Sequence, residues 1–213
     1  MRQWGYGVMV LSLVFALSGV GDPAWAGAPT EHLRLQVERV IKTLDDPELK
    51  KESRARERRQ AVRKIADDIF DFTETAKRSL GRHWANRSAA EREEFVRLFT
   101  DLLERSYLSK IETYGGEKVH YGGDAVDGDV ATVKTRIATK GGTEIPIDYK
   151  MLKRGDRWLV YDVAIEGVSL VANYRTQFNK IIQTSSYQEL VKKLKTKQEE
   201  FLEDEKQKRT SLR

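Results

Sequence analysis

The apolar residues of this chain change their spacing near Gly115, and that change limits the fold more than any other feature. Between Ser88 and Tyr114, large apolar side chains recur every three to four residues, which is the spacing of one face of a helix. Between Val130 and Ile165 they alternate with polar residues, which is typical of strands with one buried face. The sequence therefore predicts a long helix followed by a block of strands.

Short turns divide that second block into four strands. The expected strands are 118–121, 130–139, 145–151 and 158–165. Turn signals lie at 127–129, 141–142 and 154–156, and Gly122-Gly123 is also interpreted as a turn. These features predict an α+β protein of one domain, with a curved four-stranded antiparallel sheet and helices before and after it.

The segment before the long helix contains three helical stretches. Thr30 can cap a first helix that runs to about Leu44, and the charged run Lys50–Lys64 is expected to continue as a solvated helix. Its inward face is expected to resume at Val62, Ile65 and Ile69. A capping pattern at 71–74 and a glycine at 81 bound a short helix over 72–80, and Ser88 with Glu91 forms a second capping pattern.

Two helices are expected after the sheet, over 169–182 and from 187 to about 201. The remaining residues, 201–213, are charged and show no apolar period, so we expect a disordered tail.

The N-terminus has the three parts of a secretory signal. Arg2 precedes an uncharged apolar stretch, Gly7–Val20, which is too short to span a bilayer. Ala24-Trp25-Ala26 fits the small-x-small cleavage pattern, so residues 1–26 are interpreted as a signal peptide and 27–200 as the folded domain. An uncleaved anchor is the second interpretation of this segment. Export to the periplasm is the expected localisation.

Composition excludes several kinds of chemistry. The chain has no cysteine, which excludes disulfides and thiol nucleophiles, and its histidines His32, His83 and His120 are scattered. No metal site and no cofactor are therefore expected. A net charge of +5 suits an acidic surface, such as lipid head groups or an acidic protein face. It is too interspersed with acidic residues to indicate a nucleic-acid partner.

One polar group could serve catalysis. Asp148, Tyr149, Tyr161 and Asp162 lie on neighbouring strands, and an Asp base beside a Tyr donor can act in a pocket. Strand alternation favours the simpler interpretation that the tyrosines face the core and the aspartates face away. The many aromatic residues on predicted inward faces fit either a filled core or the lining of a cavity, and the residue pattern leaves both open.

Several motifs resemble a known family over about Ala28 to Lys195. They are Phe70-Asp71-Phe72, Leu80-Gly81-x-x-Trp84, the apolar run from Phe95 to Tyr107, Ile145-Pro146-Ile147-Asp148-Tyr149, Trp158-x-Val160-Tyr161-Asp162-Val163, Ile165-Glu166-Gly167-Val168-Ser169-Leu170-Val171 and Asn173-Tyr174-Arg175-x-Gln177-Phe178. In these motifs the chain is similar to the periplasmic phospholipid-binding proteins of the maintenance-of-lipid-asymmetry pathway, also called the toluene-tolerance or auxiliary ABC-transport component family.

The resemblance implies a carrier rather than an enzyme. It implies a cone of the nuclear-transport-factor-like kind that encloses acyl chains and shuttles phospholipid between an outer-membrane lipoprotein complex and an inner-membrane ABC transporter, with transient membrane contact. A hopanoid-associated branch of the family exists, so a hopanoid is a second candidate ligand. The residues themselves also allow an enzyme that acts on a small apolar substrate, or an adaptor with a filled core.

The residues expected to contact the lipid tails lie on predicted inward faces. They are Leu80, Phe95, Phe99, Leu102, Leu103, Val133, Ile147, Tyr149, Val163 and Ile165. Asp162 and Arg175 are expected to form a structural ion pair between the last strand and the helix that follows it.

The cleavage pattern yields a first prediction. We expect the mature chain to begin at Gly27, because the apolar stretch ends before the Ala24-Trp25-Ala26 pattern. N-terminal sequencing of the protein from the periplasmic fraction measures this directly, and a chain that retains Met1 there would contradict it.

Overall fold

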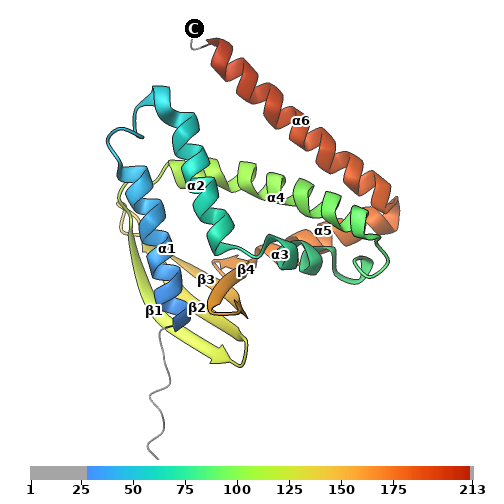
Figure 1. The fold of residues 1–213 in the computed structure, drawn as a ribbon, viewed down its shortest axis with the longest axis horizontal. Helices are drawn as coiled ribbons and strands as arrows, with labels where there is room; N and C mark the ends of the chain where they lie inside the picture. The colour runs from blue at the N-terminus through green and yellow to red at the C-terminus, as the bar shows by residue number, and fades with distance from the viewer. Residues whose placement is uncertain (1–27, 212–213) are drawn as a thin grey trace, which may run out of the picture.

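An antiparallel sheet separates two groups of helices along the chain, as the change of apolar spacing predicts (Figure 1). The computed structural model describes residues 28–211. The helices are α1 Ala28–Asp45, α2 Ala55–Ile69, α3 Phe72–Leu80, α4 Ala89–Glu112, α5 Leu170–Thr184 and α6 Tyr187–Ser211, with short 3₁₀ turns at Glu52–Arg54 and Gly81–His83. The strands are β1 Lys118–Asp127, β2 Val130–Ala138, β3 Glu144–Arg154, β4 Arg157–Ile165 and β5 Val168–Ser169. The expected signal peptide, 1–26, lies outside the described residues.

The sheet has five strands in the order β1-β2-β3-β4-β5, one more than the sequence predicts. The added strand is short: beyond the turn at Gly167, Val168 pairs with Ile165 and Ser169 pairs with Ala164. The sequence predicts that Gly167 ends the sheet, but its positive φ of 81° instead turns the chain back along β4.

The interpretation of Gly122-Gly123 as a turn is wrong, because both glycines lie inside β1. They form a bulge at which the pairing with β2 shifts between Tyr121 and Asp124, and Gly123 has a φ of 94°. The bulge places Asp124 at the start of α1. There its carboxylate accepts hydrogen bonds from the backbone N–H and the hydroxyl of Thr30, at 3.0 and 2.7 Å. Thr30 thus lies in the first turn of the helix rather than capping it.

The local helix signals are otherwise confirmed. Asp71 caps α3 by accepting the N–H of Glu74 at 2.8 Å, and Ser88 with Glu91 forms a reciprocal capping box at the start of α4. The charged run is helical only from Ala55 onward, apart from a 3₁₀ turn, and its predicted inward residues Val62, Ile65 and Ile69 are buried.

The expectation of a disordered tail from residue 201 is not met in the structure, where α6 continues to Ser211. The segment contains no glycine or proline that would end a helix, and charged residues such as Lys197 and Glu200 pair along it at 2.8 Å. Helix propensity and local ion pairs therefore extend the helix without an apolar stripe.

A second bulge, in β4, joins the sheet to the helices. The register with β3 shifts so that Tyr161 has no partner on that strand. Its free carbonyl accepts the hydroxyl of Thr75 at 2.9 Å, and the carbonyl of Val160 accepts the N–H of Asp71 at 2.9 Å. The bulge thereby fixes the start of α3 against β4.

Two packed clusters make up the interior. The helical cluster consists of Ala76, Leu80, Phe95, Leu98, Phe99, Phe178, Tyr187, Leu190, Val191 and Leu194. The sheet cluster consists of Leu33, Ile65, Ile69, Ala131, Val133, Met151, Trp158 and Val160. The first joins α3 to α6, and the second joins α1 and α2 to the sheet. Figure 1 shows these two groups of elements side by side.

Asp162 is buried where β4 meets α5, but it does not pair with Arg175 as expected. Its carboxylate accepts the hydroxyl of Ser169 at 2.7 Å and the N–H of Val171 at 3.0 Å, and Lys150 lies 3.2 Å away. It therefore supplies a charged cap at the N-terminus of α5, where a negative charge is favourable.

This capping role predicts a large loss of stability on truncation. Replacing Asp162 with alanine leaves a buried N–H and a hydroxyl without their acceptor, so we expect the free energy of unfolding to fall by about 2–4 kcal/mol. Asp148→Ala, on the neighbouring strand, is the matched control and should change it by less than about 0.5 kcal/mol. Urea unfolding of both variants measures the difference, and equal losses would contradict this role.

Candidate functional site

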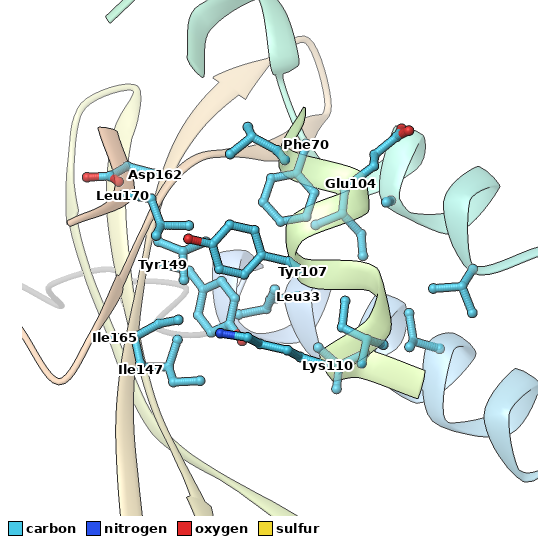
Figure 2. A pocket seen from close by; sticks show the side chains of 18 of the residues that line it. Leu33, Phe70, Glu104, Tyr107, Lys110, Ile147, Tyr149, Asp162, Ile165 and Leu170 are labelled. Atoms are coloured by element: carbon cyan, nitrogen blue, oxygen red, sulfur yellow. The ribbon is translucent and has the colours of Figure 1, made fainter. Parts of the chain in front are cut away.

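An apolar cavity of about 570 Å³ lies where the two clusters face each other (Figure 2). Leu33 and Ile69 of the sheet cluster form part of its wall, and Phe99 of the helical cluster forms another part. The volume falls within the range of about 300–1,000 Å³ that is usual for small-molecule sites. Of the two open interpretations of the aromatic residues, the structure therefore favours a lined cavity over a filled core.

Three parts of the structure supply most of the wall, and α3 adds Phe72, Thr75 and Ser79. From α1 and α2 come Leu33, Val37, Val40, Ile41, Leu44, Val62, Arg63, Ala66 and Ile69. From α4 and α5 come Phe99, Leu103, Glu104, Tyr107, Lys110, Ile111, Leu170, Val171 and Tyr174. From the sheet come Val119, Ile137, Ile145, Ile147, Tyr149, Tyr161, Asp162, Val163 and Ile165. The inward-facing side chains of helices and strands thus line one common cavity.

Six of the ten predicted contact residues lie on this wall. They are Phe99, Leu103, Ile147, Tyr149, Val163 and Ile165. The other four pack elsewhere: Leu80 and Phe95 belong to the helical cluster, Leu102 packs against it, and Val133 belongs to the sheet cluster. The broad stripe of α4 serves two neighbours, since its 95–98–102 side meets other helices and its 99–103–107 side meets the cavity.

The predicted contacts do not include the wall formed by α1 and α2. The apolar stripe of α1 is visible in the sequence, and it repeats at Leu33, Val37, Val40 and Leu44. Nothing in that pattern indicates whether the stripe packs on side chains or faces an unfilled space, and that choice depends on where α4 lies.

Two of the phenols on the wall, those of Tyr149 and Tyr174, are neutral near physiological pH. Burial raises the pKa of Tyr149 and of Tyr174 to about 12, because the phenolate would lose its hydration. These groups can therefore donate hydrogen bonds but cannot act as bases near neutral pH.

The expected alternation holds for Asp148 but not for Asp162. Ile147 and Tyr149 line the cavity, and Asp148 between them does not. On β4, the bulge puts Tyr161 and Asp162 on the wall together. In Figure 2 the Asp162 carboxylate points away from the cavity centre, toward the groups that it caps.

Ion pairs link α2 to α4 beside the cavity. Arg63 forms an ion pair with Glu104 at 3.0 Å. Glu112 pairs with Arg59 at 3.1 Å and with Arg58 at 3.7 Å. Glu104 is nearly buried, and this burial raises the pKa of its carboxyl above the usual range. These charged contacts connect two helices whose apolar faces are turned toward the cavity.

The fold and the cavity define an α+β protein with a large apolar binding space between sheet and helices. A family model for the MlaC protein matches residues 35–196. The chain therefore belongs to the MlaC family, as the sequence motifs indicate.

A protein of known name and a solved structure are also similar to this chain. The intermembrane phospholipid transport system binding protein MlaC of Haemophilus influenzae is 29% identical over 97 residues, which cover 43% of this chain and 45% of that protein. A solved structure of a phospholipid-binding protein from Ralstonia solanacearum, in complex with a phospholipid, has the same fold with a TM-score of 0.70. It is 24% identical, and the match covers 82% of this chain and 98% of that chain.

The cavity wall predicts an unusual tolerance of added bulk. Leu103 packs in part against the helical cluster but also borders the cavity, so a tryptophan there can direct its added atoms into that space. We therefore expect Leu103→Trp to change the free energy of unfolding of ligand-free protein by less than about 1 kcal/mol, below the cost of overpacking. Leu98→Trp, on the packed side of the same helix, should cost about 1–3 kcal/mol or more. Denaturant unfolding of protein refolded to remove ligand measures both values. A similar loss for the two variants would show that Leu103 is ordinary core.

Proposed function

We propose that this protein is a periplasmic carrier that holds the acyl chains of a phospholipid in its cavity. In this proposal it passes lipid between an outer-membrane lipoprotein complex and an inner-membrane ABC transporter. The cavity is the single observation that carries the proposal, because its wall is almost entirely apolar and its volume suits a ligand of that kind. Membership of the MlaC family supports the same function.

The energetics of lipid transfer favour such a cavity. Each methylene group moved from water to an apolar wall contributes about 0.8 kcal/mol, so an acyl chain is stable outside a membrane only when most of it is enclosed. The cavity meets that requirement with residues from α1, α4 and the sheet. The protein must also release the chain, which a mainly apolar wall around the tails permits.

The polar groups on the wall support a carrier over an enzyme. Tyr149 and Tyr174 stay protonated near neutral pH, since burial raises the pKa of each to about 12. Asp162 is engaged in capping α5, and Glu104 is paired with Arg63. A nucleophile activated by a base would need a different arrangement.

Two further observations support the proposed role in lipid transport. The relative from Haemophilus influenzae is named as a binding protein of an intermembrane phospholipid transport system, and this chain carries a net charge of +5 that suits contact with acidic lipid surfaces. Within residues 28–211, no helix is both long and apolar enough to cross a membrane.

Lipid uptake by cavity variants tests the proposal. Protein freed of ligand is incubated with phospholipid vesicles, separated from them, and its bound lipid is extracted and quantified. We expect Leu103→Trp and Ile147→Trp to bind several-fold less lipid than wild type, because the indole occupies the space that the tails need.

Leu35→Trp is the matched control, since Leu35 is exposed on α1 and is not part of the wall. It should bind as much lipid as wild type. Full uptake by both wall variants, or no uptake by folded wild type, would refute a lipid site in this cavity.

A further inference from the structure

One basic side chain on the cavity wall has no acidic partner. In the described part of the chain the wall includes two basic residues, Arg63 and Lys110. Arg63 is neutralised by Glu104 at 3.0 Å. No ion pair joins Lys110 to any carboxylate among the described residues, and its ammonium lies over the ring of Tyr107, 5.6 Å from the ring centre. An ammonium over an aromatic face still keeps most of its capacity to bind an anion.

Lys110 lies at the open end of the cavity. It is exposed in the last turn of α4, and its neighbour Ile111 is 40% exposed, whereas Phe99 and Leu33 deeper in the wall are buried. Figure 2 shows the Lys110 nitrogen directed into the cavity, on the side of Ile165 and Tyr149. The lysine thus places a positive charge where an apolar space meets water.

The acidic groups nearby are already occupied. Glu112 contacts Arg58 and Arg59. Glu117 accepts the backbone N–H of Gly115 at 2.7 Å, and this hydrogen bond lowers the pKa of its carboxyl.

Two neighbouring threonine hydroxyls on the wall are also committed to backbone carbonyls. Thr113 donates to the carbonyl of Lys110 at 2.7 Å, and Thr139 donates to the carbonyl of Thr143 at 3.1 Å. Of the charged groups on the wall at this end, Lys110 is therefore the one without a partner of opposite charge among the described residues.

We propose that Lys110 binds the phosphate of a phospholipid head group and thereby makes the cavity selective for phospholipids over uncharged lipids of the same chain length. The inference rests on the proposed function and adds the class of head group to it. An ammonium and a phosphate form a charge-assisted hydrogen bond, which is stronger than a bond between neutral groups. A lipid without an anionic head would leave Lys110 unpaired and would gain nothing from it.

A competition between two lipids with identical acyl chains tests this selectivity. Ligand-free protein is incubated with vesicles of phosphatidylglycerol that contain a minor fraction of the matching diacylglycerol, and the extracted lipids are compared with the vesicle composition. Wild type should enrich the phospholipid on the order of tenfold, as expected for one hydrogen bond between charged groups. Lys110→Met should lose this enrichment, and Lys110→Arg should keep it.

Lys153→Met is the control, because it removes the same charge from an exposed position on β3 that is not part of the cavity wall. It should enrich phosphatidylglycerol as wild type does. Uptake of pure diacylglycerol shows that Lys110→Met still folds and still has a cavity. Unchanged enrichment in Lys110→Met, or no enrichment in wild type, would overturn the role of Lys110. Failure of wild type to take up either lipid would instead overturn the proposed function.

Discussion

The arrangement of sheet and helices leaves an apolar space that no side chain fills, and the other features of the fold are organised around that space. The two core clusters do not merge, and about 570 Å³ remains between them. If such a space were sealed and empty, it would cost on the order of 10 kcal/mol at about 24 cal/mol per Å³, which rivals the net stability of a whole domain. The cavity fits the proposed function, in which the apolar tails of a ligand occupy that space.

Polar contacts hold the wall where packing across the cavity cannot. Asp124 anchors the start of α1 to the bulge in β1, and Asp162 anchors the start of α5 to β4. Thr75 fixes α3 to the bulge at Tyr161. Between α2 and α4 the links are ion pairs, among them the pair of Arg63 with Glu104 beside the apolar wall. These contacts lie around the cavity and join its helices to the sheet and to each other. The position of the wall therefore does not depend on a bound ligand alone.

Local signals in the sequence predict the elements well, and long-range geometry explains what they miss. The capping patterns at Asp71 and Ser88 act within four residues, so sequence alone reveals them. The hydrogen bond from Thr30 to Asp124 joins residues that are 94 positions apart in the sequence. It depends on the bulge in β1, where the pair Gly122-Gly123 is also typical of a turn. Similarly, periodicity marks Phe95 and Phe99 as inward, and both belong to the helical cluster. Only the positions of the other helices decide that Phe99 also reaches the cavity wall and Phe95 does not. Lys110 continues the 99–103–107 side of α4 by its spacing, but a charged residue near a helix end is more typical of a solvated position, so the apolar pattern does not mark it as part of the wall.

Native mass spectrometry of the protein purified without detergent from the envelope of its host tests the central claim most directly. A cavity that holds lipid in the cell predicts a mass above that of the polypeptide, with an excess that lipid extraction identifies as phospholipid. A folded protein whose mass equals that of the bare polypeptide would contradict the account.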